Sequence, residues 1–394
     1  MTAINHWQTA IDTHELNDPQ VKHLCERLEK IRPRDVAPSG RLDLLVGSPE
    51  CTHHSRAAGG TPKNDQSRCQ AWLVNHWLTD LLVDAVMLEN VPEFTEWGPL
   101  LERPIRYRGK RYKAGQPDPR RKGDYFHPWI SSLEGLGYRV EYRVQNAADY
   151  GDPQTRRRLI VMARRGGPVS WPSPSHGAAT GQPWRPVREV IDWSIKSPSI
   201  FARKKPLVPN TLRKIAKGLN RFGGQGTEPF LVRLCNSSSK ASEILSVDRP
   251  LPTITTCRGG EFALCEPFVI GQQSGSAPRS IDEPAPTVAT KGAIALVQPF
   301  LVKYYGTGGA IPVDQPLDTV TTKDRFMLIE PRTKAAVAEY DIGYRMLKPH
   351  ELAAAMSFPD GYQFAGGRTA QIKQIGNAVP VRLARAHIAA LLRH

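Results

Sequence analysis

The segments LDLLVGSPEC, residues 42–51, and AVMLENVP, residues 85–92, indicate the fold. Each begins with a short apolar run and continues into polar and turn-forming residues, which is the pattern of a buried strand that leads into a loop. The segment 71–82 between them has helical spacing. Strands that alternate with helices are typical of a parallel α/β sheet, whose ligands bind at the carboxyl ends of the strands. Cys51 and Glu89 follow two such strands, which is a first indication of function.

The same alternation continues around these segments. Residues 1–5 have the pattern of a strand end and residues 7–15 that of a helix. A further strand pair is expected at 138–145 and 158–163, and helix formers return near the C-terminus.

Residues 166–335 differ because proline and glycine are frequent and a motif repeats. The motif is a Pro-Phe start followed by Asp-x-Pro-x-x-Thr-(Ile/Val)-x-Thr. Its three copies lie at 229–256, 267–290 and 299–322. β-Branched runs bounded by proline and glycine are typical of short strands and turns. We expect a β-rich module with internal repeats, inserted into an α/β domain made of residues 1–165 and 336–394, although a purely structural repeat is the alternative.

Composition limits the class of protein. The 394 residues include 53 Lys and Arg against 38 Asp and Glu, a formal net charge of +15, and the sequence pI is near 9.6. Such a charge favours nucleic acid or another polyanion as partner. Six cysteines without a CxxC pair indicate a reducing compartment, and charges interrupt the longest apolar stretch. A secreted mini-protein, a membrane protein and a fibrous protein are excluded, and we expect a cytoplasmic location.

Two residues at strand ends are candidates for catalysis. Cys51 lies on a tight loop beside basic residues, where a thiol with a lowered pKa acts as a nucleophile. A half-buried structural thiol is the alternative, and a zinc site with His53 and His54 lacks a second ligand pair, so no metal is expected. Glu89 is a candidate acid, because a desolvated carboxyl group stays protonated near neutral pH. A helix cap or an ion-pair partner is the alternative.

Arg156 and Arg158 precede an apolar strand. Alternation along a strand predicts that both side chains lie on one face. Guanidinium groups at such a position suit contacts to phosphate or to base edges, and a solvated charge run is the alternative.

In their order, these segments resemble the DNA cytosine-5 methyltransferase family. The matching segments are Pro49-x-Cys51, Glu89-Asn90-Val91, Gln154-x-Arg156-x-Arg158, Arg345-x-Leu347-x-Pro349-x-Glu351 and Gln374-Ile375-Gly376-Asn377-Ala378-Val379-Pro380. Residues 166–335 lie where the family has its target-recognition domain. The resemblance implies a doubly wound, Rossmann-like methyltransferase sheet with that domain inserted.

The resemblance also implies a reaction, with S-adenosyl-L-methionine as methyl donor and C5 of a flipped-out cytosine in duplex DNA as acceptor. Cys51 would add to C6 and Glu89 would hold or protonate N3. Arg158, with Arg156 as a further candidate, would hold the base at O2. The residues expected to contact the cofactor are Trp7, Glu26, Ser48, Pro49, Asn377 and Val379.

Some positions depart from the family pattern. Glu50 stands directly before the cysteine, where the family has proline, and His6 stands where it has an acid. The family's glycine-rich cofactor segment is not found before Met1. A late start, a second chain that supplies this segment, and a protein that binds DNA without methylating it are the alternatives. Methylation of RNA is a further one.

Two basic stretches are candidates for DNA contact. One lies between Leu101 and Trp129 and interleaves cations with tyrosines, and the other covers 204–221. Mixed cationic and aromatic side chains suit backbone contacts and stacking, whereas a solvated surface is the alternative. The individual candidates are Ser55, Arg108, Arg111, Arg121, Lys122, Lys204 and Arg213.

Overall fold

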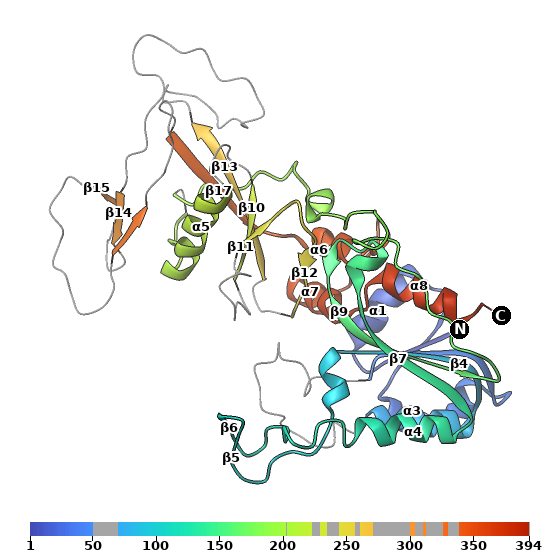
Figure 1. The fold of residues 1–394 in the computed structure, drawn as a ribbon. Helices are drawn as coiled ribbons and strands as arrows, with labels where there is room; N and C mark the ends of the chain where they lie inside the picture. Colours follow the sequence, from blue (N-terminus) through green and yellow to red (C-terminus); the bar gives the residue numbers. More distant parts are fainter. Residues whose placement is uncertain are drawn as a thin grey trace. The chain divides into compact units, whose positions relative to one another are not determined.

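The computed structural model describes most of the chain. The described residues are 1–49, 70–201, 203–222, 229–234, 244–256, 261–270, 300–303, 310–312, 326–329 and 339–393. They form two compact units (Figure 1). Unit 1 comprises Met1–Val187, Pro250–Thr256 and Leu352–His394, and unit 2 comprises Arg188–Arg249 and Cys257–Glu351. The domain boundaries expected from composition, near 165 and 336, stay predictions.

Unit 1 is built on a mixed four-stranded sheet. Its strands, in spatial order, are β3 (Arg41–Gly47), β4 (Leu82–Asn90), β9 (Arg157–Arg165) and β7 (Tyr138–Asn146). β3 and β4 are parallel, whereas β9 is antiparallel to both of its neighbours. Within this sheet, the expectation of parallel strands is therefore met by β3 and β4 and not by β9 and β7. Only a short segment joins β7 to β9, and a parallel pair needs a crossover of a dozen or more residues.

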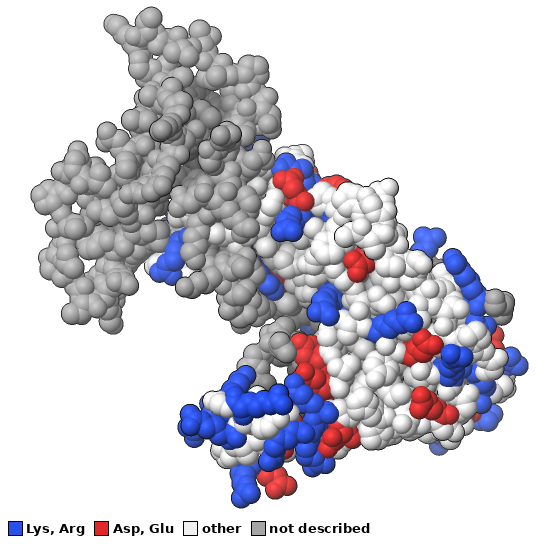
Figure 2. Space-filling view, viewed as in Figure 1, with Lys and Arg blue, Asp and Glu red and all other residues white. Residues whose placement is uncertain are grey.

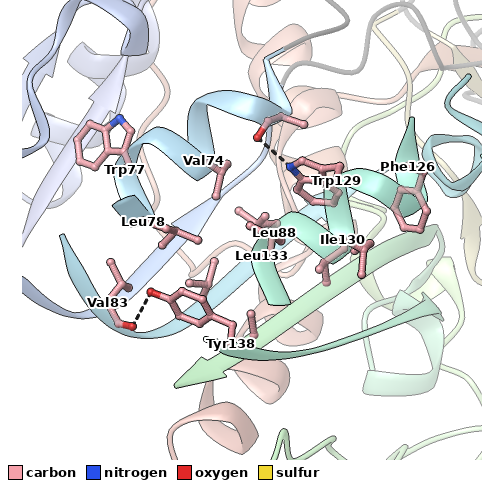
Figure 3. Close-up of a cluster of buried hydrophobic side chains, with 14 of the residues drawn as sticks. Val74, Trp77, Leu78, Val83, Leu88, Phe126, Trp129, Ile130, Leu133 and Tyr138 are labelled. Carbon is pink, nitrogen blue, oxygen red and sulfur yellow. Dashed lines mark hydrogen bonds between the residues drawn. The ribbon is translucent and has the colours of Figure 1, made fainter. Parts of the chain in front are cut away.

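Both faces of this sheet are covered (Figures 1 and 3). On one face α3 (Ala71–Asp80) and α4 (Phe126–Gly135) pack over the alternate β4 residues Val86 and Leu88. Trp129 Nε1 donates to the Ala71 carbonyl at 3.1 Å, and Tyr138 Oη to that of Val83 at 2.9 Å. On the other face, Leu383 and Leu391 of α8 (Val381–Leu391) pack against Met87 and Ile160. Burial on two faces explains the continuous apolar run of β4.

Further elements complete unit 1. β1 (Thr2–Asn5) and β2 (Lys22–Cys25) form a parallel pair joined by α1 (Gln8–Asn17), and β8 (Gln154–Thr155) pairs in parallel with β12 (Leu251–Pro252). The other elements are the 3₁₀ helices Leu28–Lys30, Pro92–Glu96 and Ala147–Tyr150, the helices α2 (Pro33–Val36) and α7 (Arg368–Asn377), and the antiparallel pair β5 (Ile105–Tyr107) and β6 (Lys110–Tyr112). α6 (Pro349–Ala355) lies at the change from unit 2 to unit 1.

Unit 2 is rich in antiparallel strands. One sheet has the order β11 (Ile244–Ser246), β10 (Phe230–Arg233), β13 (Phe262–Ile270) and β17 (Glu339–Met346), and a second has the order β15 (Ala310–Pro312), β14 (Phe300–Lys303) and β16 (Phe326–Ile329). A 3₁₀ helix covers Val187–Val190, and α5 (Pro209–Phe222) places Ile215 in the core of the first sheet.

The described strands at the start of two repeat copies are paired alike. Phe230 begins β10 and Phe300 begins β14, and each of these strands lies between two antiparallel neighbours. The start at 267 instead lies inside β13. No helix of the described ranges is long and apolar enough to cross a membrane.

Candidate active site

A buried ion pair marks the carboxyl end of β4. Arg158 Nε lies 2.7 Å from Glu89 Oε1, and the two side chains are only 11% and 10% exposed. Glu89 is directly opposite Ile160 in the β4–β9 register, and Arg158 lies two residues before Ile160 on the same face. The carboxyl group and the guanidinium are therefore diagonal neighbours on the face that α8 covers. Glu89 thus has an ion-pair partner, and its role as a catalytic acid stays a prediction.

The loop after β3 is tied to the same edge. The last pair in the β3–β4 register is Gly47 with Leu88, so Ser48 leaves the sheet at the level where Glu89 follows on β4. Asn90 Nδ2 donates to the Pro49 carbonyl at 3.3 Å, and Asn90 Oδ1 accepts from the Val91 amide at 2.9 Å. The segment that leads to the expected nucleophile is therefore held beside the ion pair. Cys51 and Ser55, like His53 and His54, lie outside the described residues.

Arg156 has quite different surroundings from Arg158. Its side chain is buried, and its guanidinium donates to three backbone carbonyls, those of Ile254 at 3.0 Å, Gly376 at 3.0 Å and Ala378 at 3.1 Å. Arg156 thus joins the β8–β9 connection to a repeat segment and to the end of α7. This environment suits a residue that positions its neighbours.

Asp152 is a buried residue that sequence reasoning missed. Its carboxylate accepts from the backbone amides of Leu383 at 3.0 Å and Arg382 at 3.3 Å, so it caps the first turn of α8. Burial raises the pKa of Asp152 to about 6, against the lowering effect of the hydrogen bonds from the Leu383 and Arg382 amides. Because Asp152 lies about 230 residues before α8 in the sequence, no local capping pattern could have indicated it.

The first two expected cofactor residues follow a parallel strand pair. Asn5 is opposite Cys25 at the end of β1 and β2, so Trp7 and Glu26 leave the same edge. Trp7 is half-buried, and Lys373 Nζ lies 4.3 Å from the centroid of its ring. Glu26 accepts from the Arg27 amide at 2.8 Å, and this hydrogen bond is the main cause of a lowered pKa for its carboxyl group.

The other expected cofactor residues lie in loops of the same unit. Ser48 and Asn377 are exposed, and Pro49 and Val379 are half-buried. Asn377 is the last residue of α7, and Val379 follows the carbonyl of Ala378 that Arg156 binds. An aromatic ring, a carboxylate and exposed amide and hydroxyl groups are chemically suited to an adenosine moiety. Among the described residues, no group of three His, Cys, Asp or Glu side chains is placed to hold a metal ion.

The expected DNA-binding residues have different environments. Arg108 and Arg111 are exposed on the β5–β6 hairpin, without an ion-pair partner in the part of the chain that the structure describes. Arg121 pairs with Asp124 and Lys122 with Glu96, each at 2.7 Å. In unit 2, Lys204 is exposed, and Arg213 Nη1 donates to Asn210 Oδ1 at 3.1 Å.

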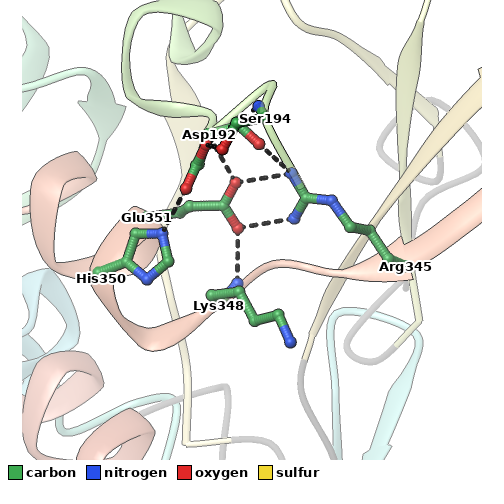
Figure 4. A network of polar contacts seen from close by, with 6 residues as sticks. All are labelled: Asp192, Ser194, Arg345, Lys348, His350 and Glu351. Atoms are coloured by element: carbon green, nitrogen blue, oxygen red, sulfur yellow. Dashed lines mark hydrogen bonds and ion pairs between the residues drawn. The ribbon is translucent and has the colours of Figure 1, made fainter. Parts of the chain in front are cut away.

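The segment 345–351 contains a second buried ion pair, within unit 2 (Figure 4). Arg345 and Glu351 form two parallel bonds of 2.8 and 2.9 Å. Glu351 also accepts from the amides of Lys348 at 2.6 Å and Asp192 at 2.9 Å. The pair is almost fully buried and its oxygens are all used, so its role is to hold the Asp192 loop on the segment 345–351.

A family model described as C-5 cytosine-specific DNA methylase matches residues 119–184 and 298–393. These ranges include Arg156, Arg158 and the segments 345–351 and 374–380, and they leave out Cys51 and Glu89.

Two of the curated proteins that are similar to this chain are named as a type II methyltransferase and a type II methylase. The type II methyltransferase M.SacI of Streptomyces achromogenes is 30% identical over 174 residues, which are 42% of this chain and 39% of that protein. The type II methylase M.HgiDII of Herpetosiphon aurantiacus is 24% identical over 276 residues, which are 62% of this chain and 69% of that protein. The match with the first relative thus spans well under half of that relative's length.

Among solved structures, that of a mutant DNMT2 of Spodoptera frugiperda is similar to the whole chain. The alignment covers 100% of this chain and 92% of that one, with a TM-score of 0.52 and 13% sequence identity. A likeness at this identity concerns the fold alone, and it agrees with the expected α/β class.

Proposed function

We propose that the chain is a C-5 cytosine-specific DNA methylase that transfers a methyl group from S-adenosyl-L-methionine to C5 of cytosine in duplex DNA. The observation that carries the proposal is the buried pair of Glu89 and Arg158, 2.7 Å apart beside the Pro49 loop. A carboxyl group and a guanidinium at one sheet edge can form hydrogen bonds to N3 and O2, respectively, of a cytosine ring.

In this proposal the pair binds a flipped-out base. The Glu89 carboxyl group holds N3 and its proton, which draws electrons from the ring and opens C6 to attack. Arg158 uses Nε for Glu89 and Nη1 for the Arg157 carbonyl, at 2.7 Å each. Nη2 has no acceptor among the described residues and would donate to O2 of the base. The pair thus supplies both polar contacts and excludes water by its burial.

Cys51 is the proposed nucleophile. Its thiolate forms a bond to C6, and the ring electrons that this addition releases make C5 nucleophilic. Bound S-adenosyl-L-methionine supplies the electrophilic methyl group. After transfer, loss of the proton from C5 restores the double bond as the sulfur–C6 bond breaks, which returns Cys51 as thiolate.

The proposed cofactor residues are Trp7 for the adenine ring, Glu26 for its amine, and Ser48, Pro49, Asn377 and Val379 around the remainder. All six belong to unit 1. In this scheme unit 1 carries the catalysis and unit 2 carries target recognition, with duplex DNA as the partner of both.

Covalent trapping tests the proposal. On a duplex that contains 5-fluorocytosine, the C5 substituent cannot leave as a proton, so the protein should stay bound to C6 in the presence of S-adenosyl-L-methionine. Loss of the adduct in Cys51→Ala and its persistence in Cys25→Ala, which changes an exposed free cysteine, is the expected result. An adduct that survives Cys51→Ala contradicts the proposed nucleophile.

The same assay separates the alternatives. DNA binding without an adduct favours a methyltransferase-like DNA-binding protein that is inactive alone, and adding a second polypeptide with a glycine-rich cofactor segment is then the next step. Trapping on 5-fluorocytidine RNA in place of DNA favours an RNA methyltransferase.

A further inference from the structure

The β5–β6 hairpin projects from a firmly held base in unit 1. Leu101 exchanges two backbone hydrogen bonds across the base, from its amide to the Gln116 carbonyl at 2.8 Å and from the Gly115 amide to its own carbonyl at 2.7 Å. The Trp97 carbonyl accepts a hydrogen bond from the Tyr125 amide at 3.0 Å. The buried indole ring of Trp97 stacks on the ring of Phe94. The hairpin therefore starts from a fixed point on the unit.

Cations around the hairpin fall into two groups. Those after the hairpin each have a carboxylate partner: Arg120 with Asp118, Arg121 with Asp124, and Lys122 with Glu96. The second group, here called the hairpin cations, is exposed and has no ion-pair partner among the described residues. The hairpin cations are Arg103, Arg106, Arg108, Lys110, Arg111 and Lys113.

The charge of the hairpin is therefore uncompensated. In residues 102–113, the six hairpin cations face a single carboxylate, Glu102, which leaves a net charge of +5. Figure 2 shows the Lys and Arg side chains gathered over this projection.

Two local features of the hairpin oppose its own stability. Arg106 is directly opposite Arg111 in the strand register, and like charges at such positions destabilise a strand pair. Arg108 has a φ of 46°, in the left-handed region that disfavours a long side chain, and it precedes Gly109 with a φ of 78°. An isolated two-stranded hairpin is marginal already. Local conflicts of this kind are expected at functional sites, where a ligand compensates for them.

The aromatic side chains indicate the class of ligand. Arg108 lies over the ring of Tyr107 and Lys110 over that of Tyr112, each at 5.4 Å from the centroid. Rings already covered by cations are poor stacking platforms for unpaired bases, which argues against a single strand. A narrow two-stranded ribbon with cations on both faces has the width that the major groove of B-DNA admits.

We propose that the β5–β6 hairpin is an arm that binds the phosphates of duplex DNA outside the active site. This proposal depends on the proposed function in one respect, namely that duplex DNA is the substrate. Neutralisation of phosphates by the hairpin cations releases counterions, so the arm adds affinity and salt dependence without reading sequence.

The test is the salt dependence of duplex binding by the full chain. The triple variant Arg106→Gln, Lys110→Gln, Arg111→Gln should reduce the slope of log K against log salt by about 2 to 3. A matched control is Lys22→Gln, Arg32→Gln, Arg385→Gln, which removes three exposed cations elsewhere in unit 1 and should leave the slope unchanged. Arg106→Lys with Arg111→Lys keeps the charges and should retain the wild-type slope, which separates loss of contact from misfolding of the hairpin.

The outcomes distinguish the arm from the reaction. If the Gln triple variant has the same salt slope as wild type for duplex DNA, the proposal that the hairpin binds duplex phosphates is wrong. The proposal is also wrong if the variant changes the slope for single-stranded RNA but not for duplex DNA. Where methyl transfer is present, the Gln triple variant should raise KM for DNA and leave kcat unchanged at saturating DNA. If no methyl transfer is detected, the salt slope of duplex binding still shows whether the hairpin binds DNA. Failure of the proposed function is therefore recognised separately from failure of the proposed arm.

Discussion

Arg156 and Gly376 are joined by a hydrogen bond of 3.0 Å from Nη2 to the carbonyl oxygen, although 220 residues separate them in the sequence. The same guanidinium binds the Ile254 carbonyl, so three distant segments meet at one buried cation. Because the β9 strand that carries Arg158 begins directly after Arg156, this junction also fixes where the proposed base-binding pair lies.

Replacing Arg156 should destabilise unit 1. Arg156→Met removes the donor from the buried carbonyls of Ile254 and Gly376, at a cost of about 1 to 3 kcal/mol for each such group, and from the partly buried carbonyl of Ala378. Arg156→Lys should rescue little, because one ammonium group does not reproduce the planar fork of donors that a guanidinium presents to several acceptors. Thermal unfolding followed by circular dichroism measures the effect. Arg157→Met, at the exposed neighbouring position, is the matched control. Equal melting temperatures for the two Met variants contradict the assigned role.

Gly376 should not tolerate a side chain. A Cβ at this position would lie 3.2 Å from the Thr255 backbone carbon and 3.3 Å from its oxygen, so Gly376→Ala should push the repeat segment away from α7. We expect a lower melting temperature and a loss of methyl transfer. Gly135→Ala in α4 meets nothing within 4 Å and should be neutral or stabilise the helix by about 0.5 to 1 kcal/mol. A Gly376→Ala variant as stable and active as wild type would show that the segment is not needed there.

Glu89→Gln should impair catalysis far more than folding. The amide keeps the shape of the side chain but cannot supply the proton at N3, so the rate of methyl transfer should fall by about 10²- to 10⁴-fold. The rate is measured in single-turnover experiments with labelled S-adenosyl-L-methionine. Glu134→Gln, on the exposed side of α4, should keep the wild-type rate. A fall of less than about threefold for Glu89→Gln contradicts its assignment.

Asp152 should make stability depend on pH. Its folded pKa of about 6 lies above the ordinary 3.8, so between these values the folded state binds more protons than the unfolded state. Stability from this group is therefore fully present below about pH 4 and falls as the pH rises to 6, by up to about 3 kcal/mol. The measurement compares unfolding midpoints of wild type and Asp152→Asn from pH 4 to 7. The difference between them should change across this window, and a constant difference contradicts the prediction.

Local patterns were sufficient for several elements of unit 1. The apolar runs at 42–46 and 85–88 lie inside β3 and β4, and the helical spacing at 71–82 lies over α3. The order of Glu89 and Arg158 among the family-like segments also indicated residues that the structure brings to 2.7 Å. These predictions hold because strand burial and helix periodicity depend on neighbours a few residues away.

Other features depended on contacts that no local pattern contains. Alternation predicted one shared face for Arg156 and Arg158, but whether each guanidinium meets carbonyls or a carboxylate depends on what the rest of the chain places there. The role of Asp152 also depends on a distant segment, because its hydrogen-bond partners are amides of a helix about 230 residues away.

The alternation of strands and helices, the basic charge and the chemical groups that the proposed reaction needs can all be predicted from residue type and short-range spacing. The antiparallel direction of β9 beside β4, the packing of a repeat segment beside Gly376 and the pairing of Glu89 with Arg158 depend on how distant parts of the chain meet in three dimensions. Buried polar groups must find partners wherever the fold supplies them, so their roles become visible only once distant segments are in contact.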